Sequence, residues 1–326
     1  MKKAFTPLSS GPSTMPFENV HLNDGNEIPA IAFGTGSEMK GKDVTHYCAQ
    51  ALDSGFSHID TAQYYGTEAT VGQAIQESGL PRSDLYVTTK YHHGEIQFSV
   101  RASLHYLKLQ YLDLYLIHGP SLVPDLEAAW KQFERIKDDG LAKSIGVSNF
   151  SLEQLQSVVK TARILPAVHQ ISFNPYNYAQ NKALLEYSAK HGIVTEAYSS
   201  LAPITKYPGG PVDAPVAAAA KRLGITPTQV ILLWVKSKGV VIVTTSRTKS
   251  RLEEYIEVGD LPPLTDDEIA AIDAAGAKGP PSAIPFVQQS RRHPAATASL
   301  VLGATLLTLL YIVRMVGCPS NGAMVS

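Results

Sequence analysis

The sequence predicts an α/β fold, a single (β/α)8 barrel, and three observations indicate it. Short runs rich in β-branched and aromatic residues alternate with longer helical patterns about eight times, which is typical of a parallel sheet. The runs are nearly continuous in apolar residues, so both faces of the sheet are expected to be covered. The length of 326 residues suits one large barrel as well as two ordinary domains. An open doubly wound sheet is the competing architecture.

The expected strands and helices alternate from the N-terminus onward. The strands cover residues 28–34, 56–60, 85–90, 112–118, 142–149, 167–173, 193–199 and 240–246. The helices cover residues 43–54, 67–78, 96–109, 125–139, 151–161, 180–191, 215–222, 226–238, 249–257 and 265–275. Ser151 and Thr265 stand at the starts of two helices. In both cases a Gln or Glu three residues later completes the pattern of a capping box.

A β-hairpin is expected ahead of the first strand. In the segment NVHLNDGNEIPA, residues 19–30, an Asp24-Gly25 pair separates two short apolar runs. This dipeptide favours the tight turns that join antiparallel strands. A hairpin at this position would plug the bottom of the barrel and leave the opposite mouth for chemistry.

Composition excludes several classes of protein. The formal net charge is -1, from 28 Lys and Arg against 29 Asp and Glu, so nucleic acid is not expected as a partner. Cys48 and Cys318 are the two cysteines, which argues against a disulfide framework and favours the reducing cytoplasm. The sequence has neither a CxxC pair nor an HExxH motif, and no metal site is expected.

The two ends of the chain are expected to lie outside the barrel. Residues 1–16 are predicted to be a flexible arm, residues 17–285 the barrel, and residues 286–326 a linker with a hydrophobic helix. Residues 295–313 carry no charge and nearly reach the roughly 20 apolar residues that a membrane span needs. Such a span would follow the basic stretch 291–293, anchor the protein in an intracellular membrane and keep the barrel cytoplasmic. A buried or interfacial helix is the alternative.

Polar residues gather where the expected strands end, and in barrel enzymes the active site lies at the carboxyl ends of the strands. Those ends read Gly34-Thr35-Gly36, Asp60, Lys90, His118, Ser148-Asn149, Gln170, Tyr198-Ser199 and Thr244-Thr245-Ser246. Each of these residues alone has an ordinary structural explanation, such as an Asp that caps the next helix. An acid, an amine and an imidazole at three neighbouring ends together predict an active site.

The residue types at this rim suit the reduction of a carbonyl group. Tyr65 follows Asp60 by five residues, but a phenol with a pKa of about 10 is a poor acid at neutral pH. An adjacent ammonium, here Lys90, would lower that pKa, and Asp60 would hold Lys90 in place. His118 would donate a hydrogen bond to the same substrate oxygen. The four groups could polarise a carbonyl and protonate the alkoxide as a hydride reaches carbon.

With these residues in place, the chain resembles the aldo-keto reductases over residues 20–275. The resemblance rests on GFSHIDTAQYYG, TTK, DLYLIH, GVSNF, HQISFNPY, EAYSSL and TTSRTKSRLEEY, in that order. The threonine pair before Ser246 resembles the fungal ketoreductase branch of the family. The resemblance implies a catalytic tetrad of Asp60, Tyr65, Lys90 and His118, with NADPH as the cofactor and a small aldehyde or activated ketone as the substrate.

The resemblance also implies a set of cofactor contacts. Ser148, Asn149 and Gln170 would grip the nicotinamide carboxamide, and Tyr198 would stack on the nicotinamide ring. The remaining contacts would be Ser199 and Leu201 with the pyrophosphate, Ser246 and Arg251 with the 2′-phosphate, and Glu254 with the adenine. Thr35, at the end of the first barrel strand, is expected at the same site.

The chain departs from the family pattern at three positions. Many members have a lysine where this chain has Thr245, and Arg247 is the expected substitute for the lost charge near the 2′-phosphate. Tyr255 replaces a common asparagine, which removes one adenine contact. Gly119 replaces a common tryptophan, so a wider or wetter substrate pocket is expected.

A further expectation concerns the loop 201–215. The loop contains Gly209-Gly210, and long loops in compact domains are often lids. Family resemblance implies that it folds over the cofactor pyrophosphate.

A rival function is that of a redox-sensing auxiliary subunit at a membrane, because potassium-channel β subunits resemble the same family. Such a subunit would bind NADPH with little turnover.

Overall fold

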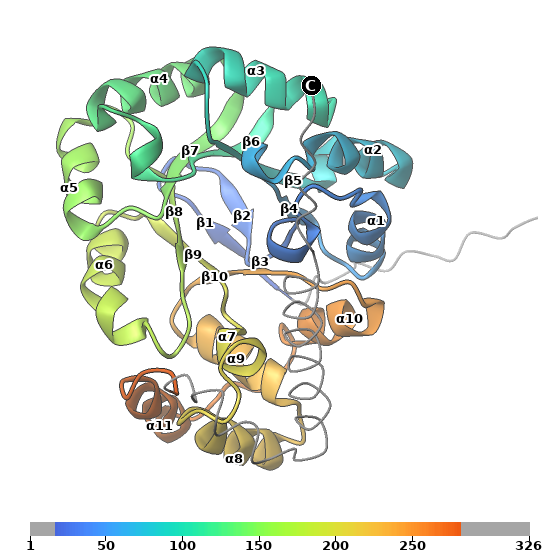
Figure 1. The fold of residues 1–326 in the computed structure, drawn as a ribbon, viewed down its shortest axis with the longest axis vertical. Helices are drawn as coiled ribbons and strands as arrows, with labels where there is room; N and C mark the ends of the chain where they lie inside the picture. The colour runs from blue at the N-terminus through green and yellow to red at the C-terminus, as the bar shows by residue number, and fades with distance from the viewer. Residues whose placement is uncertain (1–16, 282–326) are drawn as a thin grey trace, which may run out of the picture. The chain divides into compact units, whose positions relative to one another are not determined.

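Eight parallel strands close into a barrel at the centre of the molecule (Figure 1). The computed structural model describes residues 17–281. Around the barrel the strand order is β10-β3-β4-β5-β6-β7-β8-β9. The strands are β3 (Ile31–Gly34), β4 (His58–Asp60), β5 (Tyr86–Tyr91), β6 (Leu112–Ile117), β7 (Ala142–Ser148), β8 (Val168–Ser172), β9 (Val194–Tyr198) and β10 (Val241–Thr244). The predicted barrel is confirmed, and the open doubly wound sheet is excluded.

Helices form a ring outside the strands, as Figure 1 shows. They are α1 (Thr45–Asp53), α2 (Glu68–Ser78), α3 (Ile96–Leu107), α4 (Leu126–Asp138), α5 (Leu152–Thr161), α6 (Tyr178–Lys190), α7 (Ala202–Thr205), α8 (Asp213–Leu223), α9 (Pro227–Ser237), α10 (Lys249–Glu257) and α11 (Asp266–Gly276). Both predicted capping boxes are present, at Ser151 and at Thr265. A third one, at Thr226, starts α9.

A hairpin of β1 (Asn19–His21) and β2 (Glu27–Pro29) precedes the barrel. The prediction of one strand over residues 28–34 is wrong, because that run is divided between β2 and β3. Pro29 lies at the break, and proline lacks the N–H that a continuing ladder would need. The predicted turn at Asp24-Gly25 is confirmed: Gly25 has φ 84°, a conformation that glycine adopts readily.

The hairpin closes the end of the barrel where the strands begin. Leu22 and Ile28 pack in one apolar cluster with side chains of the barrel interior, among them Leu114. Asn26 Nδ2 donates to Ser144 Oγ at 3.1 Å, which ties the turn to a barrel strand. The predicted plug is therefore confirmed, and the opposite mouth of the barrel stays open.

Some predictions fall outside the part of the chain that the structure describes. The arm at 1–16 and the hydrophobic helix at 295–313 lie there, and the domain boundary at residue 285 stays a prediction. Within residues 17–281, no helix combines the length and the apolar character that a membrane crossing requires.

Candidate active site

A cavity of about 800 Å³ opens at the carboxyl ends of the strands. Most of the predicted site residues line it, although they come from distant parts of the sequence. They are Asp60, Tyr65, His118, Ser148, Asn149, Gln170, Tyr198, Ser199, Leu201, Ser246 and Arg251. Among the described residues, no group of three or more His, Cys, Asp or Glu side chains could hold a metal ion.

Three predicted residues are not part of the cavity wall. Lys90 is fully buried. Thr35 is also fully buried, and its hydroxyl donates to Thr61 Oγ1 at 2.9 Å. Glu254 lies on α10, where its carboxylate accepts a hydrogen bond from the Thr226 hydroxyl. The cofactor contacts expected of Thr35 and Glu254 stay predictions.

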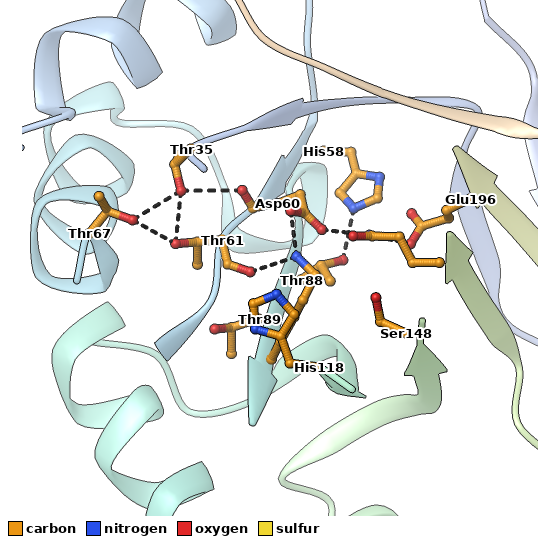
Figure 2. A network of polar contacts seen from close by, with 12 residues as sticks. Thr35, His58, Asp60, Thr61, Thr67, Thr88, Thr89, His118, Ser148 and Glu196 are labelled. Carbon is orange, nitrogen blue, oxygen red and sulfur yellow. Dashed lines mark hydrogen bonds and ion pairs between the residues drawn. The ribbon is translucent and has the colours of Figure 1, made fainter. Parts of the chain in front are cut away.

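Lys90 and Asp60 form a buried ion pair, and Figure 2 shows Asp60 among the buried polar residues of this part of the barrel. Adjacent parallel strands bring them together, because β4 pairs with β5. Lys90 Nζ donates to Asp60 Oδ1 at 2.6 Å and to the Thr61 carbonyl oxygen at 2.9 Å. Burial alone would lower the pKa of Lys90, but Asp60 and Tyr65 outweigh it and raise that pKa. The structure places Asp60 as the group that holds a charged Lys90.

Tyr65 ends a short 3₁₀ turn, Gln63–Tyr65, directly after β4. Lys90 Nζ lies 5.2 Å from the centre of its ring, and the His118 ring meets it edge-on at 5.4 Å. Burial raises the pKa of Tyr65, and Lys90 only partly opposes this effect. The predicted net lowering of this pKa is therefore wrong, because desolvation outweighs the ammonium. At neutral pH the phenol keeps its proton and can act as a donor.

His118 follows β6 and is neutral at physiological pH. Burial, with smaller effects from Lys90 and His92, lowers the pKa of His118 to about 3. A neutral imidazole has one N–H donor, and the ring lines the cavity beside Tyr65. A hydrogen-bond donor and a proton donor therefore converge on one part of the cavity.

Two polar residues at the ends of β7 and β9 are joined by a hydrogen bond in the cavity wall. Tyr198 Oη donates to Asn149 Oδ1 at 2.7 Å. Asn149 Nδ2 donates to the His118 carbonyl oxygen at 2.9 Å. Asn149 and Ser199 have positive φ angles of 61° and 58°, which are uncommon outside glycine and occur often at binding sites. These hydrogen bonds fix the orientation of the Asn149 amide next to His118.

Cationic side chains form another part of the cavity wall. Arg247 and Arg251 line it beside Ser246. Arg251 is in the first turn of α10, and helix N-termini favour bound anions. Arg247 stands at this wall, and its substitution for the lysine that many family members have stays a prediction.

The predicted lid segment also borders the cavity. The loop 201–215 contains the short helix α7, which the sequence did not predict. Leu201, Ala202, Thr205 and Lys206 contribute to the cavity wall. The loop is thus next to the site, and its closure over a cofactor stays a prediction.

Sequence reasoning missed a polar network below the cavity. Glu196 of β9 is fully buried, and Gln170 Nε2 donates to both Glu196 Oε2 and Asp60 Oδ2 at 2.9 Å. Figure 2 also shows a ring of three hydroxyls, from Thr35, Thr61 and Thr67. A signal for Glu196 did exist, since it precedes Tyr198 by two residues in an apolar strand and so shares its face.

Comparison with known proteins identifies the family. The model of the "Aldo/keto reductase family" matches residues 30–277. An aldo-keto reductase of Mycobacterium sp. (strain MCS) is 40% identical over 263 residues, 78% of this chain and 89% of that protein. The chain belongs to the aldo/keto reductase family. The resemblance read from the sequence motifs is confirmed.

Other aldo/keto reductases match over a similar span. The NAD/NADP-dependent indole-3-acetaldehyde reductase of Schizosaccharomyces pombe is 36% identical over 246 residues, 71% of this chain and 86% of that protein. The structure of a Bombyx mori aldo-keto reductase in complex with NADP has a TM-score of 0.72 and 33% identity, and covers 79% of this chain and 92% of that one. Because bacterial, fungal and animal proteins all match, the fungal branch stays a prediction.

Proposed function

We propose that this aldo/keto reductase is an NADPH-dependent carbonyl reductase that converts aldehydes or activated ketones to alcohols. One observation carries the proposal. A protonated phenol, a buried ammonium and a neutral imidazole, from Tyr65, Lys90 and His118, converge at one end of a large cavity. The reduction of a carbonyl group needs this combination of a proton donor, a charge that stabilises the donor's anion, and a hydrogen bond to the reacting oxygen.

Two sets of residues in the cavity wall carry groups that match NADPH. Hydroxyl and amide groups of Ser148, Asn149 and Gln170 match the donors and acceptors of a nicotinamide carboxamide. Arg247 and Arg251 match a phosphate, to which guanidinium groups bind in a bidentate manner. The Bombyx mori relative was solved with NADP, which supports the same cofactor class. When bound, NADPH supplies the hydride.

The protein residues divide the remaining work among them. His118 N–H donates to the carbonyl oxygen and polarises it. The Tyr65 hydroxyl gives its proton to the oxygen of the forming alkoxide, so that an alcohol and a phenolate result. Lys90, held by Asp60 at 2.6 Å, stabilises that phenolate by its charge in a site of low dielectric constant. In the reverse direction the same phenolate would accept the proton of the alcohol.

The test replaces the proposed proton donor. Tyr65→Phe removes the hydroxyl and keeps the ring, so NADPH binding is expected to persist. We expect kcat for a reactive aldehyde to fall at least about 100-fold, within the range that general acids contribute. Tyr106→Phe is the matched control, because Tyr106 lies on α3, is 53% exposed and does not line the cavity. Turnover of Tyr65→Phe near the wild-type rate would contradict the proposal.

The rival of a redox-sensing auxiliary subunit predicts tight NADPH binding with negligible turnover. No feature of residues 17–281 favours it over the enzyme. Fast steady-state reduction in a panel of carbonyl compounds would exclude the rival, and the same panel with NADPH and NADH would measure the cofactor preference.

We also propose that residues 295–313 anchor the enzyme in an intracellular membrane, with the barrel in the cytoplasm. The uncharged run and its basic flank support this. Alkaline carbonate extraction of membranes tests it. The anchored protein would stay with the membrane pellet, and release into the supernatant would contradict the proposal.

A further inference from the structure

The side-chain amide of Gln170 lies between two buried carboxyl groups. Its nitrogen Nε2 donates to Asp60 Oδ2 and to Glu196 Oε2, both at 2.9 Å. An amide NH2 group has two hydrogens, so each carboxyl group takes one of them. The opposite orientation would place the amide oxygen against the carboxylate of Asp60, which is held ionised by Lys90. The two acids therefore fix the amide and leave its oxygen for the cavity that Gln170 lines.

The charges of this cluster do not balance if both acids are ionised. Lys90 bonds to Asp60 at 2.6 Å and can neutralise one carboxylate. Glu196 is fully buried, and its second oxygen, Oε1, accepts no hydrogen bond from residues 17–281. A second buried negative charge would stay uncompensated, which is costly. A protonated Glu196 carries no such charge, and its carbonyl oxygen still accepts from Gln170.

We propose that Glu196 is a positioning residue of the nicotinamide site. As a neutral acid it shares the Gln170 amide with Asp60 and so turns the Gln170 carbonyl oxygen toward the cavity. That oxygen can then accept a hydrogen bond from the NH2 group of a nicotinamide carboxamide. The inference rests on the proposed function, since it assigns a role in binding the same cofactor.

The surroundings of Glu196 agree with a neutral acid. Burial and the charge of Asp60 raise the pKa of Glu196 to about 8. The other titratable groups in this part of the barrel are Lys90, Tyr86 and His58. Burial lowers the pKa of His58 to about 3 and raises that of Tyr86 well above its ordinary value, so both are neutral. Glu196 is therefore the group of this cluster that ionises as the pH rises through about 8.

The first experiment measures the NADPH dissociation constant by fluorescence titration of the full-length protein. Glu196→Leu keeps much of the side-chain volume and removes the acceptor. We expect NADPH binding to weaken about 5- to 10-fold, the equivalent of roughly one hydrogen bond. Glu196→Gln should recover most of this loss, because its amide oxygen can accept from Gln170. An unchanged dissociation constant in Glu196→Leu would overturn the proposal.

A double variant tests whether Glu196 acts through Gln170. If it does, Glu196→Leu adds little to the loss already caused by Gln170→Ala. Losses that simply add would assign Glu196 a general structural effect and overturn the proposal. Glu68→Gln is the matched control: this buried carboxyl group accepts from Thr89 at 2.6 Å, and we expect the NADPH dissociation constant to be unchanged.

Infrared difference spectroscopy tests the protonation state without turnover. The difference spectrum of wild type minus Glu196→Gln should show the carbonyl stretch of a protonated carboxyl group at neutral pH. This band should disappear as the pH rises, with a midpoint near pH 8. Absence of that band at neutral pH would refute the neutral acid. A protein that binds NADPH, responds to Glu196→Leu and yet reduces no carbonyl would refute the proposed function alone. Failure to bind NADPH would refute both.

Discussion

At the scale of single residues, Gly36 leaves room for the Tyr65 ring. A Cβ atom at Gly36 would lie 3.0 Å from Tyr65 Cζ and 3.3 Å from its hydroxyl oxygen. The backbone of Gly36 is extended, with φ -79°, and other residues adopt this conformation. Glycine is therefore needed here for the close approach of the phenol and not for its backbone freedom.

Gly36→Ala is predicted to impair catalysis more than cofactor binding. The added methyl group must push the Tyr65 ring by a few tenths of an ångström, away from its position near Lys90 and His118. Small displacements of a reacting group can reduce rates by orders of magnitude, and we expect kcat to fall about 10-fold. Steady-state kinetics and an NADPH titration measure the two effects. An unchanged kcat would show that the ring adapts.

The sequence predicted the candidate catalytic residues at the strand ends. It did not predict how burial and neighbouring charges set their pKa values. Asp60, Lys90 and His118 were predictable because each lies within one residue of the end of an apolar strand. The sign of the Tyr65 pKa shift was not, since it depends on the depth of burial against the distance to an ammonium. Glu196 was missed because it lies inside its strand instead of at the end, where a functional residue was expected.

At the scale of elements, apolar runs predicted seven of the eight barrel strands to within two residues at each end. The boundary at Pro29 failed because an apolar run continues across it, and only the pairing shows where the hairpin ends. Helix α7 has four residues, too few to show a helical period. Periodic patterns therefore predicted the long elements, and the short ones depend on tertiary packing.

The hairpin contributes to stability through a partly buried ion pair at its turn. Lys137 Nζ of α4 donates to Asp24 Oδ2 at 2.7 Å, and the two side chains are 21% and 7% exposed. We predict that Asp24→Asn destabilises the fold by about 1–2 kcal/mol and leaves kcat unchanged, because this turn lies at the barrel end opposite the cavity. Urea denaturation and steady-state kinetics measure the two outcomes.

A surface pair provides the control for Asp24→Asn. Glu127 and Lys131 are one turn apart on α4, and their side chains are 51% and 59% exposed. Lys131 Nζ lies 2.7 Å from Glu127 Oε1. Exposed pairs contribute little, so Glu127→Gln should change the urea midpoint much less than Asp24→Asn. Equal changes would mean that the hairpin turn adds no more than an ordinary surface contact.

At the scale of the whole molecule, buried titratable groups set the pH dependence of stability. Burial lowers the pKa of His58 and His118 to about 3 and that of His169 to about 4, from an ordinary value of about 6.5. The stability linked to these groups is present above pH 6.5 and is lost as the pH falls toward their folded values. Glu196 has the opposite sign: its folded pKa of about 8 exceeds its unfolded value, so its contribution is lost as the pH rises to 8.

These opposing groups predict a stability maximum near pH 6.5 to 7. Between about pH 4.5 and 6.5 unfolding takes up protons on three histidines and releases one from Glu196, so stability should rise with pH by at most about 3 kcal/mol per unit. Above about pH 7 the histidines contribute little, and Glu196 makes stability fall until the pH reaches about 8. Urea unfolding as a function of pH measures this curve. His58→Gln should reduce the slope of the free energy of unfolding on the acid side by the equivalent of about one proton. Glu196→Gln should reduce the slope on the alkaline side. A free energy of unfolding that stays constant from pH 5 to 8 would contradict this account.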